Sequence, residues 1–168
     1  DRSEEILDSA RDQGLDSVEV SYVKGEMMSL SYYHSSNCSD ELFAQIYEGY
    51  ERRLREENLI DFDDMLVFCY ELLKERKDIL AMWQQKFQYI LIDEFQDINK
   101  VQYEIVRMLA GKGDHLFIVG DDDQSIYRFR GARPEIMLGF EKDYPDAKKV
   151  ILNTNYRCSA EIEDSAEH

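Results

Sequence analysis

Two short apolar runs, each leading directly into acidic residues, are the feature that most limits how this chain can fold. The run "QYILI" (88–92) precedes Asp93 and Glu94, and "HLFIVG" (115–120) precedes three consecutive aspartates. A short continuous apolar run is typical of a strand buried on both faces of a parallel sheet. Amphipathic spacing in "INKVQYEIVRMLAG", between the two runs, predicts the helix that joins them.

A second helix and a third strand extend this order. The segment "PEIMLGFEKDYP" carries Pro134 at its first helical position, where proline is tolerated, and "KKVILN" (148–153) is predicted to be a strand. Alternating strands and helices predict an α/β fold with a parallel sheet and right-handed crossovers.

The first 87 residues are predicted to be mainly helical. Residues 4–13 resemble a short helix, and residues 16–38 have no clear period, although "VEVSYV" leaves a strand open. Ser39 is predicted to cap one amphipathic helix and Asp61 a second, and "ILAMWQQKF" is predicted to form a third.

Aromatic and sulfur-bearing side chains on these helices are predicted to lie in the core rather than in a binding site. The residues expected in the core are Phe43, Tyr47, Tyr50, Phe62, Phe68 and Cys69. The acidic residues Asp61, Asp63 and Asp64 are interpreted as a helix start.

Charge and composition leave the class of partner open. The formal net charge of −16 repels phosphate backbones. The segment 124–134, however, carries Arg128, Arg130 and Arg133 and no acidic residue. The three cysteines form no CxxC pair, and no apolar run approaches the roughly 20 residues of a membrane span. We therefore expect a cytoplasmic protein with no membrane partner.

The acidic residues after the predicted strands indicate where chemistry would occur. In open parallel sheets, ligands bind beyond the carboxyl ends of the strands. A carboxylate there can hold Mg²⁺, and a neighbouring one can orient or deprotonate a water molecule. Asp93 and Glu94 therefore suggest half of a nucleotide-hydrolysing site, although solvated acids in an ordinary loop remain an alternative.

Three segments in this order resemble motifs of the UvrD/Rep-like superfamily 1 DNA helicases. They are "DEFQD" (93–97), "VGDDDQSIYRFRGA" (119–132) and "LNTNYR" (152–157), and "LIDFDDML" (59–66) also looks like that family. The resemblance covers residues 40–165 well and the first 39 residues loosely. It implies a partial RecA-like (P-loop NTPase) parallel sheet preceded by a helical insertion subdomain.

The resemblance also implies a role for individual residues. Asp93, with Glu94 beside it, would hold Mg²⁺, and Glu94 would activate the attacking water. Gln124 would sense the γ-phosphate of ATP and Arg157 would contact it. The remaining implied roles are adenine stacking by Tyr156, stacking on DNA bases by Tyr127 and Phe129, and support of the DNA path by Arg130.

Two positions depart from the family pattern. Arg128 stands where the family usually has a small residue, and Phe129 stands where it usually has tryptophan. Phenylalanine keeps a stacking face but a smaller one, so we expect weaker base stacking at this position.

The phosphate-binding loop that the family requires is absent. No GxxxxGK[ST] motif occurs among the eight glycines. We therefore expect an internal fragment of a longer helicase. Its parts would be a helical insertion subdomain (1–87), the latter part of the first RecA-like domain (88–153) and the start of the segment leading to the second (154–168).

The resemblance implies an ATP-dependent helicase that moves 3′ to 5′ on single-stranded DNA. Its partners would be single-stranded or partly duplex DNA, Mg²⁺, ATP and the rest of the helicase chain. Whether the chain alone is an enzyme stays open. The alternatives are a helicase fused to a nuclease, a non-catalytic DNA- or protein-interaction module, and a two-metal nuclease site built on the same acids.

Overall fold

The computed structural model describes residues 16–112, 115–121 and 133–152, and the single positions 12, 124 and 154. The predicted helix at 4–13 lies outside these residues, apart from position 12. In chain order the described elements are α2 (Ser17–Gly25), η1 (Leu30–Tyr32), α3 (Asp40–Glu56), α4 (Phe62–Glu75), α5 (Lys77–Lys86), β1 (Ile90–Ile92), η2 (Phe95–Asp97), α6 (Lys100–Ala110), β2 (Leu116–Ile118) and α7 (Pro134–Asp143). None of the described helices is both long enough and apolar enough to cross a membrane.

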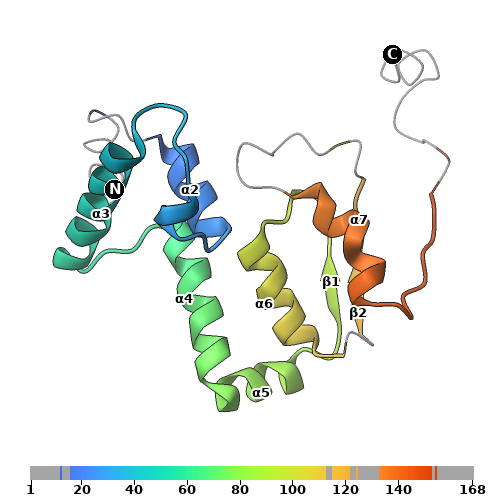
Figure 1. The fold of residues 1–168 in the computed structure, drawn as a ribbon. Helices are drawn as coiled ribbons and strands as arrows, with labels where there is room; N and C mark the ends of the chain where they lie inside the picture. The colour runs from blue at the N-terminus through green and yellow to red at the C-terminus, as the bar shows by residue number, and fades with distance from the viewer. Residues whose placement is uncertain are drawn as a thin grey trace.

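The helices α2, α3 and α4 form the N-terminal half, and α4 lies beside α6 of the second half (Figure 1). Ser39 caps α3 by accepting a hydrogen bond from the Leu42 amide, and Asp61 caps α4 in a reciprocal capping box with Asp64. Both predicted helix starts are therefore confirmed. The buried side chains of this half are Val20, Val23, Phe43, Ile46, Tyr50 and Leu54.

The segment left open as a strand is a helix, α2. Asp16 caps it by accepting a hydrogen bond from the Val18 amide at 2.9 Å. Val20 and Val23, three positions apart, lie on the face that packs into the core. Burial of that face outweighs the preference of valine for strands.

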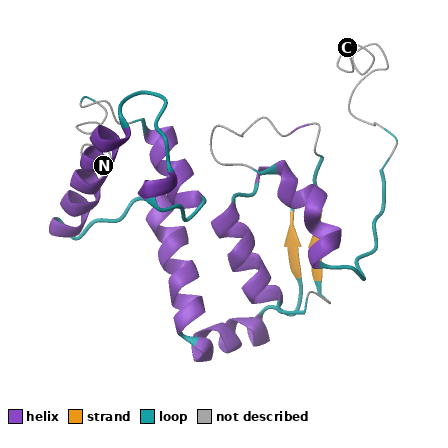
Figure 2. Cartoon of the chain, viewed as in Figure 1, coloured by secondary structure: helices purple, strands orange, loops and turns teal. Residues whose placement is uncertain are grey.

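The second half is α/β, with a small two-stranded sheet beside helices (Figure 2). Strands β1 and β2 pair in parallel, with Leu91 opposite Phe117. Helices α6 and α7 cover one face of this pair, around the fully buried Phe95. The predicted parallel pairing of the first two strands is confirmed.

The opposite face of the sheet is open, so the prediction that both faces are buried is wrong. Leu91 is 72% exposed and Phe117 is 60% exposed, because the described helices cover only the other face. The predicted third strand is also not formed in residues 148–152, where Ile151 is 75% exposed. In the described part of the chain, β1 and β2 pair only with each other, and a strand needs a neighbour for its backbone hydrogen bonds.

Helix α4 carries more apolar side chains than its neighbours cover. Phe62 is 79% exposed, Phe68 is 49% exposed, and Cys69 is exposed as well, which corrects their assignment to the core. The face that carries Asp64 and Leu73 is the buried one. Phe43 and Tyr50 lie in the core as predicted.

Candidate functional site

The candidate site begins where β1 ends in a sharp acidic turn. The side chains of Asp93 and Glu94 are both exposed, and Asp93 Oδ1 accepts a hydrogen bond from the Glu94 amide at 3.0 Å. The backbone of Glu94 is left-handed, with φ 52° and ψ 41°. This conformation is uncommon for a residue with a side chain. It bends the chain directly from the strand into η2.

The buried side chain of Phe95 holds the turn in place. Its side chain is fully buried and meets the rings of Tyr103 and Phe140 edge-on, at centroid distances of 6.0 and 5.7 Å. Its amide donates to the carbonyl of Val119 at 2.9 Å, and the Val119 amide donates to Ile92 at 2.8 Å. The acidic turn is therefore fixed to the segment that follows β2.

A buried glutamine links the two acidic segments. Gln96 is 1% exposed, and its Nε2 donates to Glu94 Oε2 at 2.8 Å. Its Oε1 accepts from the Asp121 amide at 3.1 Å. Gln124 Nε2 in turn donates to Asp121 Oδ2 at 2.6 Å. The structure thus brings Glu94 and Gln124, both predicted site residues, into one hydrogen-bonded chain.

Sequence reasoning did not single out Gln96. The available signal was its position, since a polar amide directly follows an aromatic anchor between two acids. Its burial depends on Gly120, where an added Cβ would lie 2.6 Å from Gln96 Oε1. That contact comes from a residue 24 positions away.

Asp97 closes the turn with a partly shielded carboxylate. Its Oδ1 is buried and has no hydrogen-bond partner within the described residues. Burial raises the pKa of the Asp97 carboxyl, and the negative charge of Glu94 raises it further. Among the described residues, the turn therefore holds one shielded acceptor, Asp97 Oδ1, beside the exposed carboxylates of Asp93 and Glu94.

The other predicted site residues cannot be placed. Tyr127, Phe129, Arg130, Tyr156 and Arg157 all lie outside the described residues. Of the predicted set, the structure therefore locates Asp93, Glu94 and Gln124.

The donors at the turn suit a hard cation. Asp93 and Glu94 offer exposed carboxylate oxygens at the carboxyl end of a parallel strand, which are the ligands that Mg²⁺ prefers. The described residues contain one group of three acids that could meet on an ion, and it lies elsewhere, at Glu51, Asp61 and Asp64.

That second acidic group surrounds a lysine rather than a metal. Lys24 Nζ lies 2.6 Å from a carboxylate oxygen of each of Glu51, Asp61 and Asp64, and its side chain is only 4% exposed. Tyr50 donates a further hydrogen bond to Asp61 at 2.8 Å. The group is therefore a buried ion-pair network that joins α2, α3 and α4.

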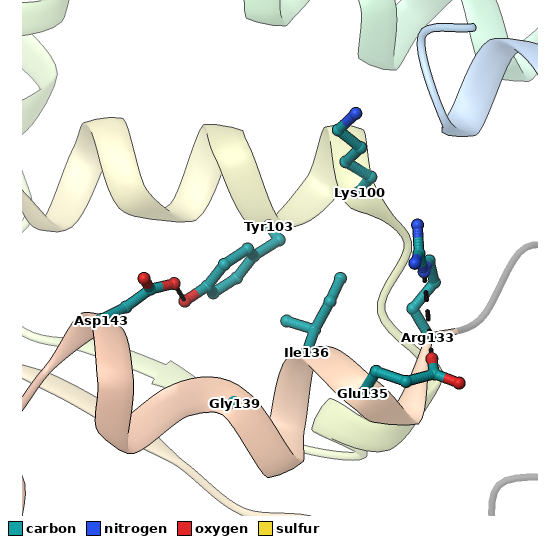
Figure 3. A pocket seen from close by; sticks show the side chains of 7 residues that line it. All are labelled: Lys100, Tyr103, Arg133, Glu135, Ile136, Gly139 and Asp143. Carbon is teal, nitrogen blue, oxygen red and sulfur yellow. Dashed lines mark hydrogen bonds and ion pairs between the residues drawn. The ribbon is translucent and has the colours of Figure 1, made fainter.

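An open pocket of about 270 Å³ lies between α6 and α7 (Figure 3). The hydrogen bond from the Tyr103 hydroxyl to Asp143 Oδ2, at 2.5 Å, bridges the two helices at one end. Burial, and then this bond, raise the pKa of Tyr103. The described residues that line it are Lys100, Tyr103, Arg133, Glu135, Ile136, Gly139 and Asp143. Its mixed charges favour no ligand class, and of the described site residues neither Asp93, Glu94 nor Gln124 lines it.

Comparison with known proteins places the chain in a family. The family model of the UvrD/REP helicase N-terminal domain matches residues 4–145. The chain is 55% identical over 123 residues to the putative ATP-dependent DNA helicase YjcD of Bacillus subtilis (strain 168), which is 73% of this chain and 16% of that protein. It is 41% identical over 149 residues to the ATP-dependent DNA helicase PcrA of Leuconostoc citreum, covering 88% of this chain and 20% of that protein.

A third relative gives the same result. The PcrA of Staphylococcus aureus is 44% identical over 134 residues, covering 80% of this chain and 18% of that protein. The chain thus spans between 16% and 20% of the length of these relatives. The family model covers most of the chain, including the acidic turn after β1 and the segment after β2. The chain belongs to the UvrD/REP helicase N-terminal domain family.

Proposed function

We propose that this chain is the part of an ATP-dependent DNA helicase that couples ATP hydrolysis to single-stranded DNA, within a motor that moves 3′ to 5′ and separates strands. The observation that carries the proposal is the hydrogen-bonded chain from Glu94 through Gln96 and Asp121 to Gln124 at the carboxyl ends of β1 and β2. The names of the relatives, ATP-dependent DNA helicases, support the same assignment.

The acidic turn would supply the hydrolytic half of the site. Asp93, with Glu94 beside it, has the exposed oxygen donors to hold Mg²⁺, which when bound offsets the negative charge of the ATP phosphates. Glu94 would accept a proton from the attacking water, because its carboxylate is exposed to solvent while Gln96 holds one of its oxygens. Gln124 would contact the γ-phosphate.

The remaining roles rest on the motif resemblance alone. Tyr156 would stack on adenine and Arg157 would contact the γ-phosphate. Tyr127, Phe129 and Arg130 would contact single-stranded or partly duplex DNA. The proposed division is a helical insertion subdomain (1–87), the latter part of a RecA-like domain (88–153) and the entry to a second RecA-like domain (154–168).

One observation favours a second candidate function for the chain in isolation. Its 168 residues contain no GxxxxGK[ST] loop to cradle the phosphates of ATP. We propose that the rest of a longer helicase chain supplies this loop. By itself, the chain would then be a DNA- or protein-interaction module without turnover. A nuclease domain elsewhere in a longer protein would make the whole a helicase–nuclease.

The test is Mg²⁺-dependent ATP hydrolysis with and without single-stranded DNA, in the complete protein that carries this segment and in the 168-residue chain. Glu94→Gln should lower DNA-stimulated turnover in the complete protein by about 100-fold or more, the range for loss of a general base. Glu71→Gln, at an exposed position of α4, is the matched control and should leave turnover unchanged. DNA-stimulated turnover by the chain alone would contradict the division of labour, and an inactive complete protein would contradict the function.

A further inference from the structure

Gln96 is buried where an uncharged polar side chain is costly unless both ends of its amide are satisfied. It is 1% exposed, although Glu94 and Asp93 in the same turn are exposed. Its Nε2 donates to the Glu94 carboxylate at 2.8 Å and its Oε1 accepts from the Asp121 amide at 3.1 Å. The two partners fix which way the amide points, because a carboxylate only accepts and a backbone N–H only donates.

The two bonds require one hydrogen-bond donor and one acceptor at the end of the same side chain. Glutamate would keep the acceptor for Asp121 but lose the donor to Glu94 and add a repelling charge. Methionine would keep much of the length and lose both bonds. Asparagine is one methylene shorter and cannot reach both partners from the same backbone position. Glutamine is therefore the residue that this bridge needs.

The bridge joins the acidic turn after β1 to the residues that follow β2. On one side it holds the Glu94 carboxylate, which the left-handed backbone turn projects outward. On the other side its Oε1 accepts a hydrogen bond from the Asp121 amide, and the Asp121 carboxylate accepts one from Gln124 Nε2 at 2.6 Å. Gly120 packs against the same Gln96 oxygen, so a shift of this segment displaces the amide.

We infer that Gln96 is a positioning residue: it orients the Glu94 carboxylate and passes to it the position of Gly120 and Asp121, which follow β2. The inference rests on the proposed function and adds a residue to it. It implies that stimulation of ATP turnover by DNA passes through this amide. Gln96 itself touches neither water nor nucleotide in this scheme.

The test compares Gln96→Glu and Gln96→Met with Gln84→Glu in the complete protein. Gln84 is the matched control, since its Nε2 also donates a partly buried hydrogen bond, to the Met108 carbonyl at 2.7 Å, away from the acidic turn. Both Gln96 variants should lower DNA-stimulated kcat by about 10- to 100-fold, the range seen when a hydrogen-bond partner behind a functional ligand is removed. KM for ATP and Kd for single-stranded DNA should change less than about threefold, because ground-state binding is untouched.

A double-variant cycle separates positioning from general damage. In a Glu94→Gln background, Gln96→Met should cause almost no further loss of single-turnover rate, because residues that act as a unit are not additive. Unchanged kcat in Gln96→Met, an additive loss in the cycle, or an equal loss of kcat in Gln84→Glu would each overturn the inference.

The remaining outcomes are also decisive. If Gln96→Glu does not fold, Gln96→Met carries the test without a buried charge. If neither folds, Gly120→Ala is the substitute, because its added Cβ would displace the Gln96 amide oxygen. This variant should lower kcat and leave KM for ATP unchanged. An unmodified protein without DNA-stimulated turnover contradicts the proposed function, whereas an active protein that is indifferent to these changes contradicts only the role of Gln96.

Discussion

The ammonium nitrogen of Lys24 lies 2.6 Å from Asp61 Oδ2 in the interior of the helical half, where it joins α2 to the first turn of α4. Glu51 and Asp64 reach the same nitrogen at the same distance. Three carboxylates around one buried cation leave an excess of negative charge, so the network depends on its single lysine. Breaking a buried ion pair by removing one partner is far more costly than its net contribution to folding.

Lys24→Met should therefore destabilise the chain by about 3–5 kcal/mol, the usual cost of leaving buried charge uncompensated. The measurement is urea unfolding of the 168-residue chain followed by circular dichroism. Lys74→Met, at an exposed position of α4, is the control and should change the free energy of unfolding by less than about 0.5 kcal/mol. Equal effects of the two substitutions would show that the network contributes nothing specific.

The same network should set the response to acid. Burial alone would raise the pKa of Asp61, but the charge and hydrogen bond of Lys24, with the Asp64 amide, hold it below its usual value. A carboxyl with a lowered pKa stabilises the fold above its unfolded pKa and loses this contribution as pH falls through the folded value. The free energy of unfolding should therefore fall from about pH 4 downward, since unfolded Asp titrates near 3.9.

Lys24→Met should reverse this trend. Without the ammonium, the three carboxylates repel one another, and protonation relieves the repulsion. The variant should gain more stability than the unmodified chain as pH is lowered from about 7 to 5. Burial raises the pKa of Asp63, so protonation of this carboxyl adds stability as pH falls in both proteins. Parallel pH profiles for the two proteins would contradict the proposed electrostatics.

Glu26 and Arg133 should couple the two halves of the molecule. Arg133 Nη1 donates to Glu26 Oε2 at 2.6 Å, across 107 positions of sequence, and the Glu26 side chain is only 4% exposed. The Arg133 side chain is 42% exposed, so water screens part of the interaction. A double-variant cycle of Glu26→Gln and Arg133→Gln should give a coupling free energy of about 0.5–2 kcal/mol in urea unfolding. The same cycle on Arg76 and Asp78, an exposed pair, should give a value near zero.

The helices that begin at Asp40 and Phe62 could be predicted because their signals are local. Ser39 and Asp61 are cap residues followed by an amphipathic period, and both interactions lie within one turn. The helix α2 could not be predicted in this way, since its valines favour a strand and it is their burial in the core of the helical half that favours the helix. The third strand fails for the opposite reason: an apolar run at 148–153 predicts a strand, but a strand also needs a neighbour.

The same distinction between local and distant signals applies to the functional residues. Asp93 and Glu94 could be placed because the end of an apolar strand is visible in the sequence. Gln96 and Lys24 could not, because their importance comes from partners far along the chain, at Asp121 and Asp61. Burial of a polar side chain by distant residues leaves no periodic signal, and such residues emerge only when the contacts are known.

Two glycines provide a closing test of how tightly the segment after β2 is held. A Cβ on Gly120 would lie 2.6 Å from Gln96 Oε1 and 3.1 Å from Met137 Sδ, whereas a Cβ on Gly139 meets nothing within 4 Å. Gly120→Ala must push the Gln96 amide away from Asp121 and should cost about 1–3 kcal/mol, as overpacking does. Gly139→Ala, within α7, should instead stabilise the chain by about 0.5–1 kcal/mol through helix propensity. Opposite signs in urea unfolding are the expected result, and a neutral Gly120→Ala would mean that this segment yields without cost, so that Gln96 could not transmit its position.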